Sequence, residues 1–124
     1  HVNQEGRQQR VFSEMNEAIK AFTSDLKSSH RFDEVLMMTF SEFGRRVAQN
    51  ASGGTDHGTA NNMFLISGGL KRSGLLNGMP DLASLVEGDL QDRLDFKSVY
   101  ATILNRWLEA DDHKILIWRN KILS

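Results

Sequence analysis

The first part of the chain carries apolar residues at intervals of three and four. Between Gly6 and about Ser28 they stand at Val11, Phe12, Met15, Ala18, Ile19, Phe22 and Leu26. Charged residues fill the positions between them, so one side of this segment suits a core and the other suits water. The spacing predicts one amphipathic helix, which ends at Ser28-Ser29-His30.

Two short, continuous apolar runs follow, EVLMMTF at 34–40 and MFLIS at 63–67. Their length and position predict strands that are buried on both faces. A helix that leads into such a strand is the pattern of an α/β fold. The polar, glycine-containing residues 41–62 predict a short helical piece at 42–48 and then an open loop.

Residues 70–95 read as irregular, with room for a short helix at 81–86 after the single proline. Asp95 is expected to cap the next helix, because its carboxylate can accept hydrogen bonds from the free amides of the first turn. That helix presents one apolar stripe, which we expect to be core: Phe96, Val99, Tyr100, Ile103, Leu104, Trp107 and Leu108. The apolar tail from His113 onward is compatible with a strand or a helix.

Composition narrows the class of protein. The chain has 124 residues, which suits one domain, and 15 basic and 16 acidic side chains give a formal net charge of −1. This mixture creates no broad field for nucleic acid or an anionic membrane, and no apolar run is long enough to span a bilayer. We therefore expect no nucleic-acid partner and no membrane span. Cysteine is absent, so a metal would need histidine and carboxylate ligands.

Asp56 and His57 stand next to each other in a glycine-rich loop, GGTDHG. Both residue types favour turns, so one interpretation is a turn whose histidine bonds only to backbone. Long loops in compact domains are usually functional or disordered, however, and this one leads directly into a predicted strand. The second interpretation makes His57 a metal ligand, with Asp56 shaping the turn or orienting the imidazole.

Three segments stand in one order along the chain: MTFSEFGRR (38–46), GGTDHGTANNMF (53–64) and DFKSVYATIL (95–104). HVNQ (1–4) also resembles the end of an Asp-Thr-His-x-x-Gln motif. With these motifs the sequence resembles the C-terminal part of the bacterial domain-of-unknown-function family fifteen-hundred-and-one, sulfatase-like proteins of the alkaline-phosphatase superfamily. The resemblance implies an α/β fold, a small mixed sheet with flanking helices that is a fragment of a three-layer fold. Residues 1–124 would be one domain, the C-terminal part of a larger one.

The same resemblance implies a metal-dependent hydrolase of phosphate or sulfate esters in the intact protein. His57 matches a metal-binding histidine, Glu42 stands at the position of a metal-binding aspartate, and His1 matches an earlier histidine ligand. The nucleophile and the first metal-binding aspartate belong to an N-terminal half. This fragment is therefore expected to be inactive and to hold no metal by itself, and zinc, manganese and calcium all remain open for the intact protein.

Phe43 stands where the resemblance expects another histidine, and a hydrocarbon ring cannot bind a metal. This departure supports a second interpretation, a degenerate binding or scaffold module without catalysis. Other readings also stay open: Glu42 suits a helix N-terminus, His1 lies at the end of the chain, and Asp56 suits the turn. Arg45 suits either an anionic group, which arginine can grip with two parallel bonds, or a solvated surface.

Two expectations concern neighbours in space. Glu42 follows the first predicted strand and His57 precedes the second, so they can share an ion only if these strands run antiparallel and side by side. Strands missing from this chain would leave sheet edges and apolar faces uncovered. We therefore expect association with the N-terminal remainder of the protein or between copies of the chain. The resemblance also implies an exported, periplasmic protein, although these residues contain no leader.

Overall fold

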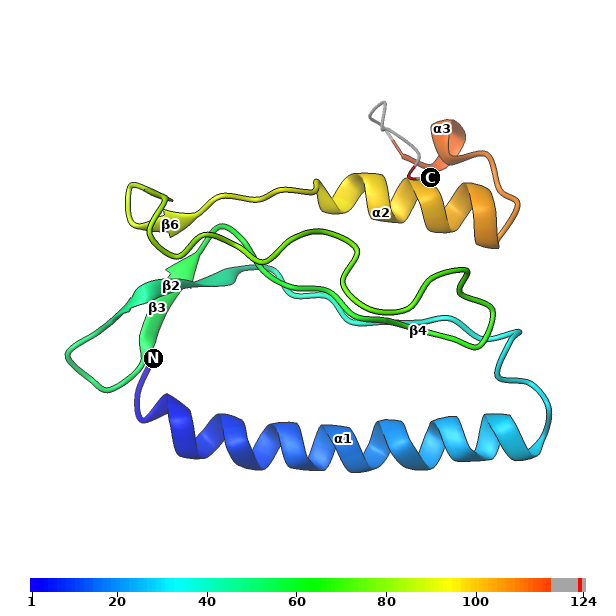
Figure 1. Cartoon of the computed structure of the whole chain (residues 1–124), viewed down its shortest axis with the longest axis horizontal. Helices are drawn as coiled ribbons and strands as arrows, with labels where there is room; N and C mark the ends of the chain where they lie inside the picture. The colour runs from blue at the N-terminus through cyan, green and yellow to red at the C-terminus, as the bar shows by residue number, and fades with distance from the viewer. Residues whose placement is uncertain (117–122, 124) are drawn as a thin grey trace. The chain divides into compact units, whose positions relative to one another are not determined.

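The structure is a computed structural model that describes residues 1–116 and 123 (Figure 1). It divides into two compact units, His1–Gln91 and Asp92–Ser124. The first contains one long helix and three pairs of strands, and the described part of the second is helical. The predicted α/β class is confirmed, with the strands arranged as three two-stranded antiparallel sheets. The single domain that belongs to a larger one stays a prediction.

Helix α1, Gln4–Ser28, confirms the amphipathic helix predicted from the spacing. Only Leu26 on it is buried, whereas four apolar side chains are strongly exposed: Val11 at 51%, Phe12 at 54%, Met15 at 38% and Phe22 at 46%. The sequence therefore specifies an apolar face that the described residues leave largely uncovered.

Both ends of α1 are tied to other parts of the first unit. At the start, Asn3 N and Gln4 N donate hydrogen bonds to Ser52 O and Gly53 O, each at 3.1 Å. Past the other end, Gly68 N donates to the carbonyl of Phe32 at 3.1 Å. The N-terminus consequently lies beside the hairpin of strands β2 (Gly44–Gln49) and β3 (Thr55–Gly58), as Figure 1 shows.

The two predicted strands form one antiparallel pair, β1 (Met37–Met38) with β4 (Leu65–Ile66). The expected adjacency and direction are confirmed. The strands are shorter than predicted and only half-buried, and Phe40 and Phe64 beside them are 73% and 53% exposed. Burial on both faces was therefore wrong for this chain, because the described residues supply no layer that covers both faces.

A hairpin replaces the predicted helix and open loop. Strand β2, Gly44–Gln49, pairs antiparallel with β3, Thr55–Gly58. The helix expected at 42–48 is wrong, since these backbone groups pair across to β3 instead of with their own next turn. Gly44 permits this path: a Cβ there would lie 1.6 Å from the carbonyl oxygen of Ala60.

A second hairpin joins β5 (Leu85–Val86) to β6 (Asp89–Leu90), where the sequence predicted a short helix at 81–86. Its two turn residues, Glu87 and Gly88, both have positive φ, 52° and 85°. That is the backbone of the two-residue hairpin turns that match strand twist. Arg46 connects β2 to this hairpin, because its guanidinium donates to the Glu87 carbonyl and lies 3.5 Å from the Asp89 carboxylate.

The second unit begins with the predicted cap: Asp95 Oδ1 accepts from Lys97 N at 3.0 Å and starts helix α2, Phe96–Thr102. The helix continues as a π-helical turn, η1 (Ile103–Trp107), and a short helix α3 (Asp112–Ile115) follows. Of the predicted stripe, Val99 is buried, while its end members Phe96 and Leu108 are 51% and 59% exposed. The part of the predicted tail from residue 117 to 122 lies outside the described residues.

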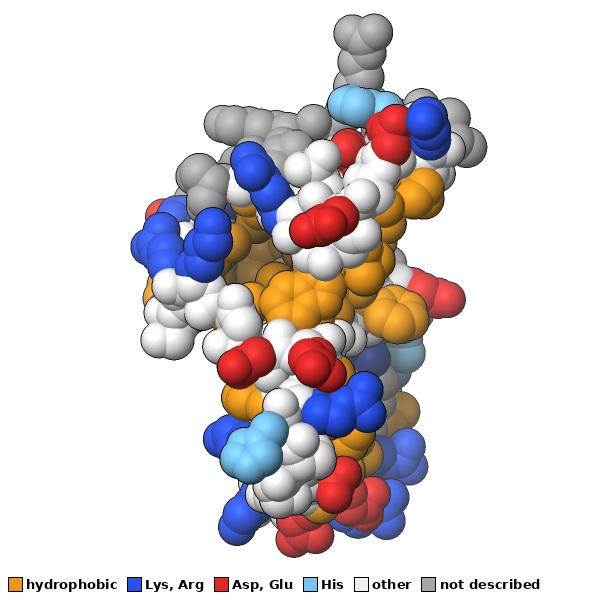
Figure 2. Space-filling view, turned by 90° about the vertical axis from the view of Figure 1, so that its right-hand side faces the viewer, with side chains coloured by type: hydrophobic (Ala, Val, Ile, Leu, Met, Phe, Trp, Pro, Cys, Tyr) orange, Lys and Arg blue, Asp and Glu red, His pale blue; other side chains and the backbone are white. Residues whose placement is uncertain are grey.

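Few side chains of the described residues are fully withdrawn from water. The buried apolar ones are Leu26 in the first unit and Val99 and Ala101 in the second. Hydrophobic surface is accordingly visible on the face shown in Figure 2. Within the described ranges, no helix combines the length and apolar character needed to cross a membrane.

Candidate functional site

The register of the β2–β3 hairpin places Arg45 directly opposite His57. Directly opposed residues of an antiparallel pair project from the same face, so these two side chains share one side of the hairpin. Phe43, just before β2, stacks on His57 with ring centroids 3.6 Å apart, and the Arg45 guanidinium lies 5.5 Å from the Phe43 centroid. An imidazole, a phenyl ring and a cation therefore form one surface cluster.

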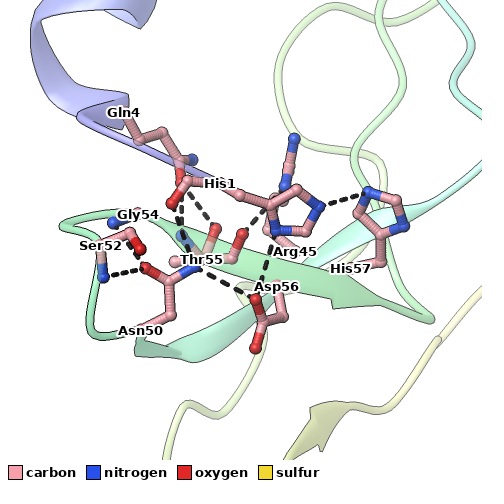
Figure 3. A network of polar contacts seen from close by, with 9 residues as sticks. All are labelled: His1, Gln4, Arg45, Asn50, Ser52, Gly54, Thr55, Asp56 and His57. Carbon is pink, nitrogen blue, oxygen red and sulfur yellow. Dashed lines mark hydrogen bonds and ion pairs between the residues drawn. The ribbon is translucent and has the colours of Figure 1, made fainter.

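His1, the first residue of the sequence, also contacts this cluster (Figure 3). Its Nε2 lies 3.0 Å from Nε2 of His57, and the two ring centroids are 4.6 Å apart. Its other ring nitrogen, Nδ1, lies 3.2 Å from Oδ1 of Asp56. Asp56 consequently contacts the ring of His1, whereas the sequence predicts that it shapes the turn or orients His57.

Several contacts hold the N-terminal residues against the hairpin. Gln4 Oε1 accepts from Thr55 N at 2.8 Å and from Thr55 Oγ1 at 2.7 Å. The His1 carbonyl accepts from Asn50 Nδ2 at 3.1 Å. Gly54 makes room for this approach, because a Cβ at that position would lie 2.2 Å from the His1 carbonyl oxygen. The position of His1 is therefore fixed by backbone contacts as well as by its ring.

The site is open to solvent. The side chains of His1 and Asp56 are 49% and 60% exposed. Arg45 is half-buried and uses Nη1 to donate to the Thr55 carbonyl at 2.9 Å. Its neighbour Arg46 is held by the β5–β6 hairpin instead, which leaves Arg45 as the arginine of this cluster.

Glu42 lies in the exposed segment between β1 and β2, one residue before Phe43. The antiparallel β1–β4 pairing that shared ligation required is present. Even so, among residues 1–116 and 123 no three or more His, Asp or Glu side chains form a group that could hold a metal ion. The described structure places His1 within hydrogen-bond distance of both Asp56 and His57, and no hydrogen bond or ion pair of the described residues connects Glu42 with these three side chains.

A comparison with models of protein families assigns this chain to a family. The family model described as "Protein of unknown function (DUF1501)" matches residues 1–117. The chain belongs to the DUF1501 family. Comparisons of the chain with curated proteins and with solved structures each gave no match. The DUF1501 part of the sequence resemblance is thereby confirmed.

One residue of this DUF1501 chain that contacts the site was not identified from the sequence. Asn50 donates from Nδ2 to Asp56 Oδ1 at 3.1 Å, and its Oδ1 accepts from Ser52 N and Gly54 N, each at 3.0 Å. A signal was present: an asparagine that opens a serine- and glycine-rich turn often bonds to the backbone two residues on. Its contact with Asp56 depends on the β2–β3 hairpin, whereas the sequence predicts an open loop in this region.

Proposed function

We propose that the intact protein is a metal-dependent hydrolase of phosphate or sulfate esters, and that this chain supplies part of its metal site. The observation that supports this most directly is the pair of imidazole nitrogens, His1 Nε2 and His57 Nε2, 3.0 Å apart. The Asp56 carboxylate contacts the other ring nitrogen of His1, Nδ1. Metal-bound histidines usually donate their other ring N–H to such a carboxylate, which orients the ring and raises its basicity.

The donor set fits a metal that accepts nitrogen ligands. A separation of 3.0 Å is less than twice a zinc–nitrogen bond of ~2.0–2.1 Å, so one ion can reach both rings. Imidazole favours zinc and similar transition metals, whereas calcium is held by oxygen ligands. We therefore favour zinc over manganese and calcium, both of which prefer oxygen ligands. On the sequence resemblance alone we also propose Glu42 as a ligand, and the other ligands would come from the N-terminal half of the intact protein.

Arg45 is the residue we propose to hold the anionic group of the substrate. It shares the face of the hairpin with His57, and among the described residues its guanidinium donates one hydrogen bond, from Nη1 to the Thr55 carbonyl. Guanidinium groups hold phosphate and sulfate oxygens through paired hydrogen bonds. When bound, the metal would polarise an ester oxygen and stabilise the charge that develops on it.

The resemblance places the nucleophile outside this chain, so we propose that residues 1–124 alone do not catalyse the reaction. It also supports export of the intact protein to the periplasm. Cell fractionation would test that location, and recovery of the protein only with the cytoplasm would contradict it.

The experiment that tests the function measures bound metal and ester hydrolysis in the intact protein, with and without His57→Ala. We expect stoichiometric metal and activity on aryl phosphate or aryl sulfate esters, both lost in the variant. His30→Asn is the matched control, because His30 has a left-handed backbone (φ 56°) that asparagine tolerates. Metal and activity retained in His57→Ala would contradict the proposal.

A non-catalytic binding or scaffold module is the alternative, and one observation favours it. Phe43 occupies the position of an expected ligand and packs its ring face to face on His57. A stacked pair of this kind stabilises a surface without binding an ion. If neither the natural protein nor His57→Ala contains metal or hydrolyses esters, this alternative replaces the hydrolase.

A further inference from the structure

We infer that Asn50 is a positioning residue, which acts through Asp56 to fix the tautomer of His1 and thereby aims a nitrogen lone pair at His57. This inference rests on the proposed metal site for its purpose. The hydrogen-bond relay itself is a property of the chain without metal, so it can be tested separately.

The first step is the orientation of the Asn50 amide. Its Oδ1 accepts two backbone hydrogen bonds, from Ser52 N and Gly54 N, each at 3.0 Å. Since N–H groups only donate, this end of the amide must be the oxygen. The turn of the hairpin thus decides which way the amide faces, and Nδ2 has to point toward His1 and Asp56 (Figure 3).

The second step is the use of both Nδ2 hydrogens. One goes to the backbone carbonyl of His1 and the other to Oδ1 of Asp56, both at 3.1 Å. Asn50 therefore holds the backbone of His1 and the carboxylate that touches its ring at the same time. A residue that fixes both partners of a hydrogen bond limits the geometries that the bond can adopt.

The third step is the proton on His1. An ionised carboxylate can only accept, so the 3.2 Å contact between Asp56 Oδ1 and His1 Nδ1 places a proton on Nδ1. In the neutral ring Nε2 then carries the lone pair, and it faces His57 Nε2 at 3.0 Å. Without metal, His57 donates into this lone pair. If a metal were bound, the same lone pair would be available to it as a ligand.

The test begins with the natural protein and needs no variant. Ring ¹⁵N chemical shifts, recorded without metal at a pH where the imidazoles are neutral, report which nitrogen of His1 is protonated. We expect the Nδ1–H tautomer to dominate, although free histidine in water favours Nε2–H. Dominance of Nε2–H in the folded protein would overturn the inference directly.

The variant Asn50→Ser then separates the two roles of Asn50, its support of the turn and its hydrogen bond to Asp56. A serine hydroxyl can still accept from the turn amides but cannot reach Asp56. We expect the Nδ1–H form of His1 to fall from the major to the minor tautomer. The affinity for added Zn²⁺ should weaken by about 10-fold to 100-fold. Asn61→Ser is the control, because Asn61 bonds to the Phe43 carbonyl and not to the His1–Asp56 pair. An unchanged tautomer in Asn50→Ser with the hairpin intact would also overturn the inference.

Asp56→Ala keeps the Asn50 turn bonds and removes the other half of the relay. We expect it to cause the same tautomer change, and the double variant to add nothing further, because both substitutions break one chain of contacts. Additive effects would mean that Asn50 acts on His1 by another route. If the tautomers behave as expected but neither the natural protein nor any variant binds Zn²⁺, the hydrogen-bond relay is supported and the proposed metal function is contradicted.

Discussion

Phe43 and His57 lie almost parallel, with ring centroids 3.6 Å apart and an interplanar angle of 18°. A side chain at position 43 is therefore within reach of whatever His57 binds. We predict that Phe43→His adds a third imidazole and strengthens Zn²⁺ binding by at least about tenfold, ~1.4 kcal/mol, measured by calorimetric titration. Phe40→His is the control, since Phe40 is 73% exposed and belongs to no part of the cluster. Equal affinities in both variants would argue against a metal site at His57.

Gly54 is expected to be intolerant of any side chain. Its Cβ would lie 2.2 Å from the His1 carbonyl oxygen, so Gly54→Ala must push the N-terminal residues away from the hairpin. We expect a loss of about 1–3 kcal/mol in unfolding free energy, measured in urea, and loss of the His1–His57 proximity in NMR spectra. Gly6→Ala is the contrasting variant, because a Cβ there meets nothing within 4 Å and alanine suits a helix better. A stable Gly54→Ala protein with the two rings still adjacent would contradict the geometry.

Asp95 is expected to stabilise helix α2 only through the hydrogen-bond acceptor of its side chain. Asp95→Ala removes the side-chain acceptor of the hydrogen bond from Lys97 N in the first turn of α2. We expect destabilisation of about 1 kcal/mol, measured as a shift of the thermal or urea midpoint. Asp95→Asn keeps the acceptor, so it should be nearly neutral. Equal losses in both variants would indicate a role for the charge instead of the cap.

The exposed face of α1 should make the chain associate. Phe12 and Phe22 are 54% and 46% exposed on the same apolar side of the helix. We propose that the N-terminal remainder of the protein covers this face and that isolated chains cover it by self-association. Replacing both by glutamine should shift a size-exclusion profile toward monomer, whereas Glu14→Gln, on the polar side, should not. A salt-insensitive monomer of the unchanged chain would exclude self-association.

Local signals were the part of the fold that the sequence predicted well. The three-and-four spacing around Phe12, Ile19 and Phe22 needs no knowledge of the partner surface to specify a helix, and it gave α1 within two residues at its start. The Asp95 cap is also a contact over two residues. Burial was harder to predict, because it depends on which other segments are present to cover an apolar side chain.

The two hairpins were not predicted from the sequence, for a different reason. The residues of β2 show no strict alternation of polar and apolar side chains, so the pairing of Gly44 with Gly58 left no periodic trace. The signal that the sequence did carry for this hairpin was its glycines, Gly44 and Gly58, which stand where two backbones approach closely. In β5–β6 the signal was the Glu87-Gly88 pair, which behaves as the familiar Asn-Gly turn does.

For the site, Asp56 and His57 were identified from their context, and His1 came only from the family resemblance. No local pattern connects residue 1 with residue 57, because that contact depends on Gln4 binding Thr55 and on the space left by Gly54. Asn50 was missed since its role requires the hairpin. Long-range polar contacts of this kind have no period along the chain.

The position of His1 also has a practical consequence for purification. Its ring lies against His57, and its carbonyl is fixed by Asn50. When residues 1–124 are prepared alone, a polyhistidine tag fused in front of His1 would bring foreign imidazoles to the same spot and would load nickel there during affinity chromatography. A tag at the opposite terminus, or one removed by a protease, keeps any ion that is later found attributable to the chain itself.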